Sequence, residues 1–194
     1  MWPQRNATLS VGSLLRSTYL LYFSKPAAER ALYRAARSKA IGSIVELGID
    51  LGGRTPRLLE IASWRSKLLP LRYTGIDLFE ARTNGQPGLT LKQAFAALKQ
   101  PHVSVQLVPG DPAGALRRVA NSLTNTDLLV IAADQDRASL AAAWSWVPRM
   151  LTATSLVFLQ EPDGKPGLLR WRSLTTAEIR RFAEEAGKPM RRAA

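Results

Sequence analysis

The stretch SIVELGIDLGGRT, residues 43–55, decides the fold of this chain of 194 residues. Its first five residues form a short apolar run, which predicts a buried strand. Gly48, Gly52 and Gly53 follow, and the residues from Arg54 to position 69 predict a helix. A strand, a glycine-rich turn and a helix in this order indicate the first unit of an α/β domain.

The same alternation of strand and helix repeats along the chain. Four further strands are predicted over residues 73–79, 103–111, 127–134 and 155–161, with helices between them over 89–100, 112–123 and 137–151. Four of the five strands are almost continuous apolar runs, as expected for a parallel sheet that helices cover on both faces. The predicted fold is therefore α/β, with a doubly wound and mostly parallel sheet.

Helical and basic segments flank this core. Residues 25–40 have the pattern of an amphipathic helix, and a capped helix is predicted over 175–187, after a turn-rich break at 162–167. The last residues are enough for one short strand at most. We predict three parts, which are a basic N-terminal helical segment (1–40), an α/β domain (41–187) and a basic tail (188–194).

The composition excludes several kinds of chemistry. Hydrophobic residues make up 46% of the chain and charged residues 22%, which is the balance of a globular protein with a core. The chain has no cysteine, and His102 is its one histidine. Disulfides, thiolate nucleophiles, Cys-ligated metals, multi-histidine metal sites and histidine-based triads are therefore excluded.

The net charge of +12 lies mainly at the two ends of the chain. Residues 1–40 carry +6 and residues 165–194 carry +5, whereas the centre carries +1. Such ends suit an anionic partner, either nucleic acid or a membrane surface, and they also serve solubility. Nucleic acid is a weaker expectation, because no basic patch is interleaved with aromatic residues. No transmembrane run or secretory signal is found, so the cytoplasm is the simplest compartment.

Acidic residues stand at the ends of the predicted strands. They are Glu46, Asp77, Asp111, Asp134 and Glu161. In an open α/β sheet, ligands bind where the carboxyl ends of the strands meet, near the switch in strand order. Ionised carboxylates accept hydrogen bonds and repel phosphates, so this set predicts a ligand rich in hydroxyl and amino groups.

The spacing of the glycine turn disfavours a dinucleotide. The turn lacks the pattern G-x-G-x-x-G, and Asp77 follows Gly48 by 29 residues, where that motif places its acid about 20 residues on. The pattern G-x-x-x-x-G-K-[ST] is absent as well, which sets aside a P-loop NTPase.

The turn ELGIDLGG resembles the first motif of the class I S-adenosylmethionine-dependent methyltransferases, in the variant E-x-G-x-x-x-G-G. YTGIDLF is similar to the second strand of that family, VPGDPAGAL to its G-D-[AS] segment, DLLVIAAD to its fourth strand, and residues 175–187 to its helix before the last hairpin. The resemblance covers roughly residues 28–187. It implies a Rossmann-like methyltransferase fold, with S-adenosylmethionine as the cofactor.

The resemblance also implies roles for single residues. Gly48 and Gly52 would let the backbone approach the methionine part of the cofactor, with the Glu46 carboxylate near its amino group. Asp77 would accept hydrogen bonds from the ribose hydroxyls, and Asp111 would face the adenine amino group.

Asp134 is the candidate general base, which would orient the hydroxyl or amine of an acceptor. The three aspartates also have purely structural alternatives. Asp77 and Asp111 could serve as turn or helix-capping acids, and Asp134 could cap the helix that follows it.

The sequence departs from the family at positions where metal-dependent members carry ligands. Ala132 and Gln135 stand in place of an aspartate and a histidine, and Gln160-Glu161 replace the usual pair after the fifth strand, so no metal site is expected. Asp50 lies inside the glycine turn and is expected to point outward, because it would otherwise repel the carboxylate of the cofactor.

The chain also looks too short at its C-terminus to complete the final hairpin of the family. The strand over 155–161 would then lie near a sheet edge, and an exposed apolar edge pairs readily with another chain. We therefore expect either a homodimer or a covering of this edge by the N-terminal segment.

Two functions follow as hypotheses. The first is methyl transfer from S-adenosylmethionine to an oxygen or nitrogen of a small molecule, whose identity the sequence does not reveal. The second is a catalytically degenerate Rossmann-like module that binds a partner or an anionic polymer. An RNA-directed methyltransferase is less favoured, because no N-P-P-Y-type motif follows the fourth strand.

Overall fold

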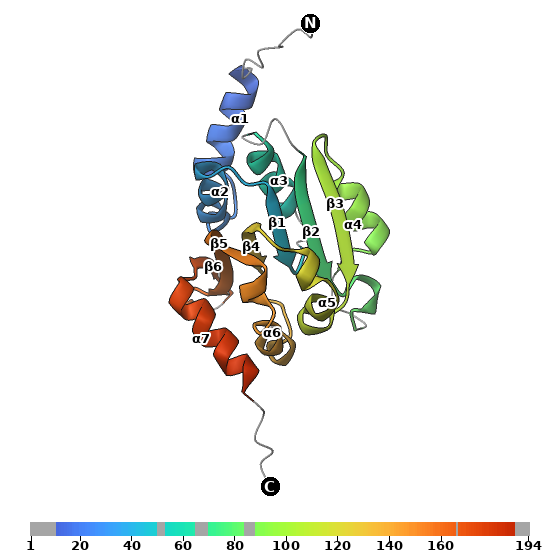
Figure 1. Cartoon of the computed structure of the whole chain (residues 1–194). Helices are drawn as coiled ribbons and strands as arrows, with labels where there is room; N and C mark the ends of the chain where they lie inside the picture. The colour runs from blue at the N-terminus through green and yellow to red at the C-terminus, as the bar shows by residue number, and fades with distance from the viewer. Residues whose placement is uncertain (1–10, 50–52, 65–69, 84–87, 166, 189–194) are drawn as a thin grey trace, which may run out of the picture.

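The computed structural model describes residues 11–49, 53–64, 70–83, 88–165 and 167–188. Within these ranges one sheet of six strands forms the centre of the molecule (Figure 1). The strands are β1 (Ser43–Leu47), β2 (Leu71–Asp77), β3 (Val103–Pro109), β4 (Thr126–Ile131), β5 (Leu151–Pro162) and β6 (Leu169–Ser173).

The strand order is β3-β2-β1-β4-β5-β6. The first five strands are parallel, and β6 runs antiparallel to β5. The chain winds outward from β1 through β2 to β3, and then returns to the other side of β1 at β4. The switch in strand order therefore lies between β1 and β4, where Leu47 stands opposite both Ile76 and Ile131. Ligand sites of doubly wound sheets form at this kind of position.

Helices cover both faces of the sheet. The first group consists of α1 (Val11–Tyr22), α2 (Glu29–Ser38), α3 (Arg54–Ser63) and α4 (Leu91–Leu98). The second group consists of α5 (Pro112–Val119), α6 (Arg137–Ala143) and α7 (Thr176–Gly187). Each group packs into its own hydrophobic cluster against the strands, so the domain has three layers.

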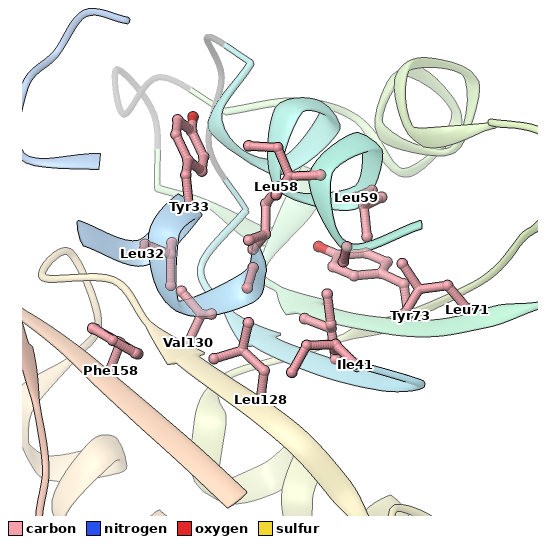
Figure 2. Close-up of a cluster of buried hydrophobic side chains, with 14 of the residues drawn as sticks. Leu32, Tyr33, Ile41, Leu58, Leu59, Leu71, Tyr73, Leu128, Val130 and Phe158 are labelled. Atoms are coloured by element: carbon pink, nitrogen blue, oxygen red, sulfur yellow. The ribbon is translucent and has the colours of Figure 1, made fainter. Parts of the chain in front are cut away.

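The cluster under the first group brings together residues that lie far apart in the sequence. Figure 2 shows Leu32 and Tyr33 of α2 with Leu58 of α3, above Val130 of β4 and Phe158 of β5. Leu32, Tyr33, Leu58 and Val130 have no more than 1% of their surface exposed. Burial of an aliphatic or aromatic side chain of this size stabilises the fold by about 1.5–3 kcal/mol.

Strand β1 is buried on both faces, which explains its apolar sequence. Ile44 belongs to the first cluster, whereas Val45 and Leu47 belong to the second. The edge strand β3 differs, because partly buried and exposed residues alternate along most of it and only Val108 is fully buried. The prediction of a doubly wound, mostly parallel α/β sheet is confirmed.

The sheet contains one strand more than predicted. β6 pairs along β5, with Leu159 opposite Arg172 and Gln160 opposite Trp171. The expectation that strand five lies at an open edge is therefore wrong, because a hairpin before α7 covers that edge. A period-two pattern in LRWRS, where two arginines alternate with apolar residues, is the signal that could have predicted β6. The homodimer stays a prediction that no longer rests on this edge.

Two helical predictions also need correction. The helix predicted over 25–40 begins at Glu29, and a separate helix, α1, precedes it. The helix predicted over 137–151 ends at Ala143, and a short 3-10 turn at Val147–Arg149 contains Pro148 near its start. Proline lacks the N–H that a longer helix would need there. No helix in the described parts of the chain is long and apolar enough to cross a membrane.

Candidate cofactor site at the carboxyl ends of the strands

Three of the predicted site residues line one small cavity at the switch in strand order. Asp77 ends β2, Asp111 follows β3, and Asp134 follows β4. The other lining residues are Leu78, Arg82, Pro112, Gln135 and Asp136. The cavity holds about 40 Å³. Small-molecule sites usually occupy about 300–1,000 Å³, so the cavity in this conformation is far smaller than a nucleoside requires.

Gly48 brings the turn after β1 into close contact with the end of β4. Its φ is +85°, and a Cβ there would lie 2.3 Å from Gln135 Nε2 and 2.8 Å from Asp134 Oδ1. Both the backbone angle and the lack of space require glycine. This close approach involves side chains of the protein itself, so the predicted approach of a cofactor to Gly48 stays a prediction. Gly52 and Asp50 lie outside the described residues.

Asp77 is 5% exposed, and protein groups saturate its carboxylate. Oδ2 accepts from Ile49 N at 2.8 Å and Oδ1 from Phe79 N at 3.2 Å. The guanidinium of Arg82 donates to both oxygens, through Nη2 at 2.7 and 2.8 Å and through Nε at 3.1 Å. The turn-acid alternative is therefore realised for Asp77, since two backbone amides of adjacent turns hold it in place.

Arg82 spans the cavity between two strand ends. Its Nη1 lies 3.6 Å from Asp134 Oδ2, and its side chain is 15% exposed. Burial lowers the pKa of this guanidinium, but the hydrogen bonds and charges of Asp77 and Asp134 together raise the pKa above its usual value. Gly88 leaves the space that the side chain fills, because a Cβ there would lie 2.4 Å from Arg82 Cδ.

Glu46 lies in the core of the protein, with no exposed surface. Its Oε1 accepts from Arg54 Nη2 at 2.8 Å, and its Oε2 accepts from Thr55 Oγ1 at 2.9 Å and from the Tyr73 hydroxyl at 2.7 Å. Burial, followed by the charge and hydrogen bond of Glu46, raises the pKa of Tyr73 well above its usual value. All these partners are protein groups, so a contact of Glu46 with a ligand stays a prediction.

The Glu46 network also reaches the glycine turn. Arg54 Nη2 donates to the Gly48 carbonyl oxygen at 2.9 Å, and the Arg54 guanidinium lies 5.1 Å above the ring of Trp171 on β6. Arg54 thereby connects β1, the turn after it and β6.

Asp111 caps α5. Its side chain accepts from Gly114 N at 3.1 Å, and Ser139 Oγ of α6 donates to the same oxygen. These two hydrogen bonds, that of Ser139 first, lower the pKa of Asp111 below its usual value. The capping alternative is therefore realised, although the residue also lines the cavity.

Asp134 has a more open position, with 52% of its side chain exposed. Its Oδ1 accepts from Gln135 Nε2 at 2.8 Å. The expectation that Asp134 caps the next helix is wrong, because Asp136 caps α6 by accepting from Ser139 N at 2.7 Å. Asp134 is thus available to the cavity and to solvent.

The acid near the end of β5, Glu161, does not line the cavity. Glu161 forms ion pairs with Arg170 at 2.7 Å and Arg172 at 3.0 Å, both on β6. Its pKa is lowered because the hydrogen bonds and charges of these arginines outweigh the opposing effect of burial. Across the described ranges no group of three or more His, Asp or Glu side chains is placed to hold a metal ion.

Sequence reasoning missed the partners of these acids. Arg54, Arg82 and Ser139 carry no motif, and their distances along the chain from Glu46, Asp77 and Asp111 follow from how the loops fold. The acids could be predicted because parallel strands end at one edge, whereas a partner that arrives from a loop leaves no periodic signal.

Comparison with known proteins shows what the fold resembles. No family model and no curated protein matches the sequence. Among solved structures, the apo form of CalS11, a TDP-rhamnose 3'-O-methyltransferase of calicheamicin biosynthesis, has a TM-score of 0.53 and 23% identity, over 77% of this chain and 76% of that one.

Two further solved structures have the same fold. A TehB-like SAM-dependent methyltransferase from Corynebacterium glutamicum has a TM-score of 0.51 and 17% identity, over 91% of this chain and 81% of that one. The O-methyltransferase TomG from Streptomyces achromogenes, solved with SAM, has the same TM-score and identity, over 91% and 78%. The chain therefore has the Rossmann-like fold of class I methyltransferases.

Proposed function

We propose that this protein binds S-adenosylmethionine and transfers its methyl group to an oxygen or nitrogen of a small molecule. The observation that carries the proposal is the meeting of Asp77, Asp111 and Asp134 around one cavity at the switch in strand order. The fold shared with small-molecule methyltransferases supports it.

The chemistry of the lining residues fits this cofactor. The carboxylates of Asp77 and Asp111 are acceptors for hydroxyl and amino groups, which are the donors of an adenosine. Gly48 leaves the backbone of the first turn without a Cβ at the cavity. Arg82 does not fit, because its cation occupies the acceptors of Asp77 and has to move before a ribose can bind there. The Gln135 amide against Gly48 and the Ser139 hydroxyl on Asp111 also occupy positions proposed for the cofactor.

The proposed roles follow from these positions. Asp77 would accept from the two ribose hydroxyls and Asp111 from the adenine amino group, while Gly48 and Gly52 would face the methionine part. For Glu46 we propose an indirect contribution, because Arg54 couples its carboxylate to the Gly48 carbonyl. Glu46 would then set the conformation of the turn.

S-adenosylmethionine supplies a methyl group that its sulfonium already activates, so the protein mainly has to position the acceptor. Asp134 is the candidate for this task, because it combines exposure to solvent with a place at the cavity. Its carboxylate can accept the proton of an acceptor hydroxyl or amine, or orient that group by a hydrogen bond.

A titration with S-adenosylmethionine and S-adenosylhomocysteine tests the proposal. At about a hundredfold excess over Kd, binding stabilises the fold by about 2.7 kcal/mol, which raises Tm by roughly 5–10 °C for a domain of this size. Asp77→Ala is expected to weaken binding at least about tenfold, because charged hydrogen bonds to the ribose contribute about 1.5–3 kcal/mol each.

Asp163→Ala is the matched control, because Asp163 is an exposed acid that pairs with Arg170 away from the cavity. Its affinity for the cofactor should equal that of the unmodified protein. If Asp77→Ala binds as well as the control, Asp77 does not belong to the site. If the folded protein and its variants bind neither compound, the degenerate binding module becomes the better explanation, and binding of anionic polymers should be measured against salt concentration.

A further inference from the structure

The carboxylate of Asp77 holds two kinds of partner that differ in how easily they can leave. Ile49 N and Phe79 N belong to the backbone of the turns after β1 and β2, so they are fixed with the fold. The remaining donors all belong to Arg82. A carboxylate offers about four lone-pair positions, so Asp77 cannot accept from a ribose while Arg82 stays bound.

The position of Arg82 also accounts for the small volume of the cavity. The side chain lies between Asp77 on β2 and Asp134 after β4, so it crosses the space in front of the turn after β1. The cavity that remains is about 40 Å³. Withdrawal of this one side chain would both free the Asp77 oxygens and widen the cavity.

Gly88 makes this arrangement possible. A Cβ on Gly88 would lie 2.4 Å from Cδ and 2.7 Å from Nε of Arg82, and the φ of Gly88 is outside the left-handed region. Alanine is thus compatible with the backbone at this position but not with the present Arg82 conformer. A substitution at Gly88 would displace Arg82 without removing either member of the ion pair.

We propose that Arg82 is an internal competitor of the cofactor, which occupies Asp77 in the free protein and determines the affinity for adenosine-containing ligands. This inference rests on the proposed function, since it assumes that such a ligand binds at Asp77. Arg82 holds the site closed, and a ligand binds when its hydroxyl donors replace the guanidinium.

The expected size of the effect follows from populations. When the competent conformation makes up only a fraction of the molecules, the apparent Kd equals the intrinsic Kd divided by that fraction. Minor states of proteins are commonly populated at about 0.1–10%. Removal of the competitor should therefore tighten binding by about tenfold or more, and the increase should appear mainly in the association rate.

The experiment compares the affinity and association rate of S-adenosylhomocysteine for four proteins, by calorimetry and stopped-flow measurement. This ligand lacks the sulfonium charge, so the loss of an arginine does not change its affinity through that charge. The proteins are the unmodified chain, Arg82→Ala, Gly88→Ala and the control Arg118→Ala. Arg118 is an exposed cation at the same end of the sheet, and it donates to the Pro109 carbonyl instead of to Asp77.

We expect Arg82→Ala and Gly88→Ala to bind at least tenfold more tightly, and Arg118→Ala to bind within about twofold of the unmodified protein. The inference is also supported if Arg82→Ala and Gly88→Ala bind the ligand while the unmodified protein and Arg118→Ala show no binding. If the unmodified protein binds and Arg82→Ala binds equally or more weakly, Arg82 is not a competitor, while the proposed cofactor stands. If none of the four folded proteins binds, the proposed function fails together with the inference.

Discussion

Two acids on adjacent strands, Glu46 on β1 and Asp77 on β2, each pair with an arginine that follows in the sequence, but their surroundings differ. Each is followed by an arginine that pairs with it, Arg54 at 2.8 Å and Arg82 at 2.7 Å. Glu46 and Arg54 are 0% and 6% exposed, and their network joins hydroxyl groups of the core. Arg82 is 15% exposed, and it faces a cavity and a second acid.

The difference shows that the position of an acid near a strand end does not by itself determine its role. The Glu46 side chain leaves β1 toward α3 and Tyr73 of β2, so its partners are buried groups of the core. The Asp77 side chain stands at the last residue of β2, so one of its partners comes from a loop at the edge of the cavity. The burial of Glu46 and its partners fits a structural role, whereas our proposal requires Asp77 to exchange Arg82 for a ligand.

The largest effect is expected when the buried pair is broken. Glu46→Gln should lower the free energy of unfolding by about 3–5 kcal/mol, because it leaves Arg54 buried without a counter-charge. Asp77→Asn should cost less, about 1–3 kcal/mol, because Arg82 can turn toward water. Urea denaturation at pH 7 measures both losses. Equal losses would abolish the distinction between the two acids.

An intermediate effect is expected at Asp111, which lines the cavity and also caps α5. Asp111→Ala should lower the free energy of unfolding by about 0.5–2 kcal/mol through loss of the cap. Asp111→Asn should lower it much less, because asparagine also caps helices. The pKa of Asp111 is lowered in the folded protein, so its contribution is present above its usual pKa and is lost as the pH falls through the folded value. The free energy of unfolding should be measured from pH 7 to pH 3 for the unmodified protein and for Asp111→Ala. The difference between the two should become smaller as the pH falls. A difference that widens in acid would contradict this assignment.

The smallest effect on stability is expected at Glu178, which is an acid paired with arginine on the surface. Hydrogen bonds from the Thr175 backbone and hydroxyl, and then from Arg172, lower the pKa of Glu178 to about 2. Its contribution should be complete above the usual pKa of 4.5 and should disappear as the pH falls toward 2. An NMR titration measures this pKa directly, with Glu178→Gln to assign the signal. Salt should weaken the pair with Arg172, unlike the pair of Glu46 and Arg54.

The sequence by itself determined the layers of this protein and the edge at which a ligand would bind. Apolar runs such as SIVEL and DLLVI are typical of strands that a helix-covered sheet buries on both faces, and parallel strands place Asp77, Asp111 and Asp134 at one edge. Gly48 was predictable from local sequence, because a sharp turn after a buried strand requires glycine.

Only the tertiary structure decided which partner each acid has. β6 was missed because its period-two pattern spans only five residues and contains two arginines, so its hydrophobic signal is weak. Arg54, Arg82 and Ser139 reach their acids from loops or other helices, so neither spacing nor periodicity encodes these contacts. Local sequence determines where a backbone turns or stays straight, whereas the burial and charge around a side chain depend on every segment that packs against it.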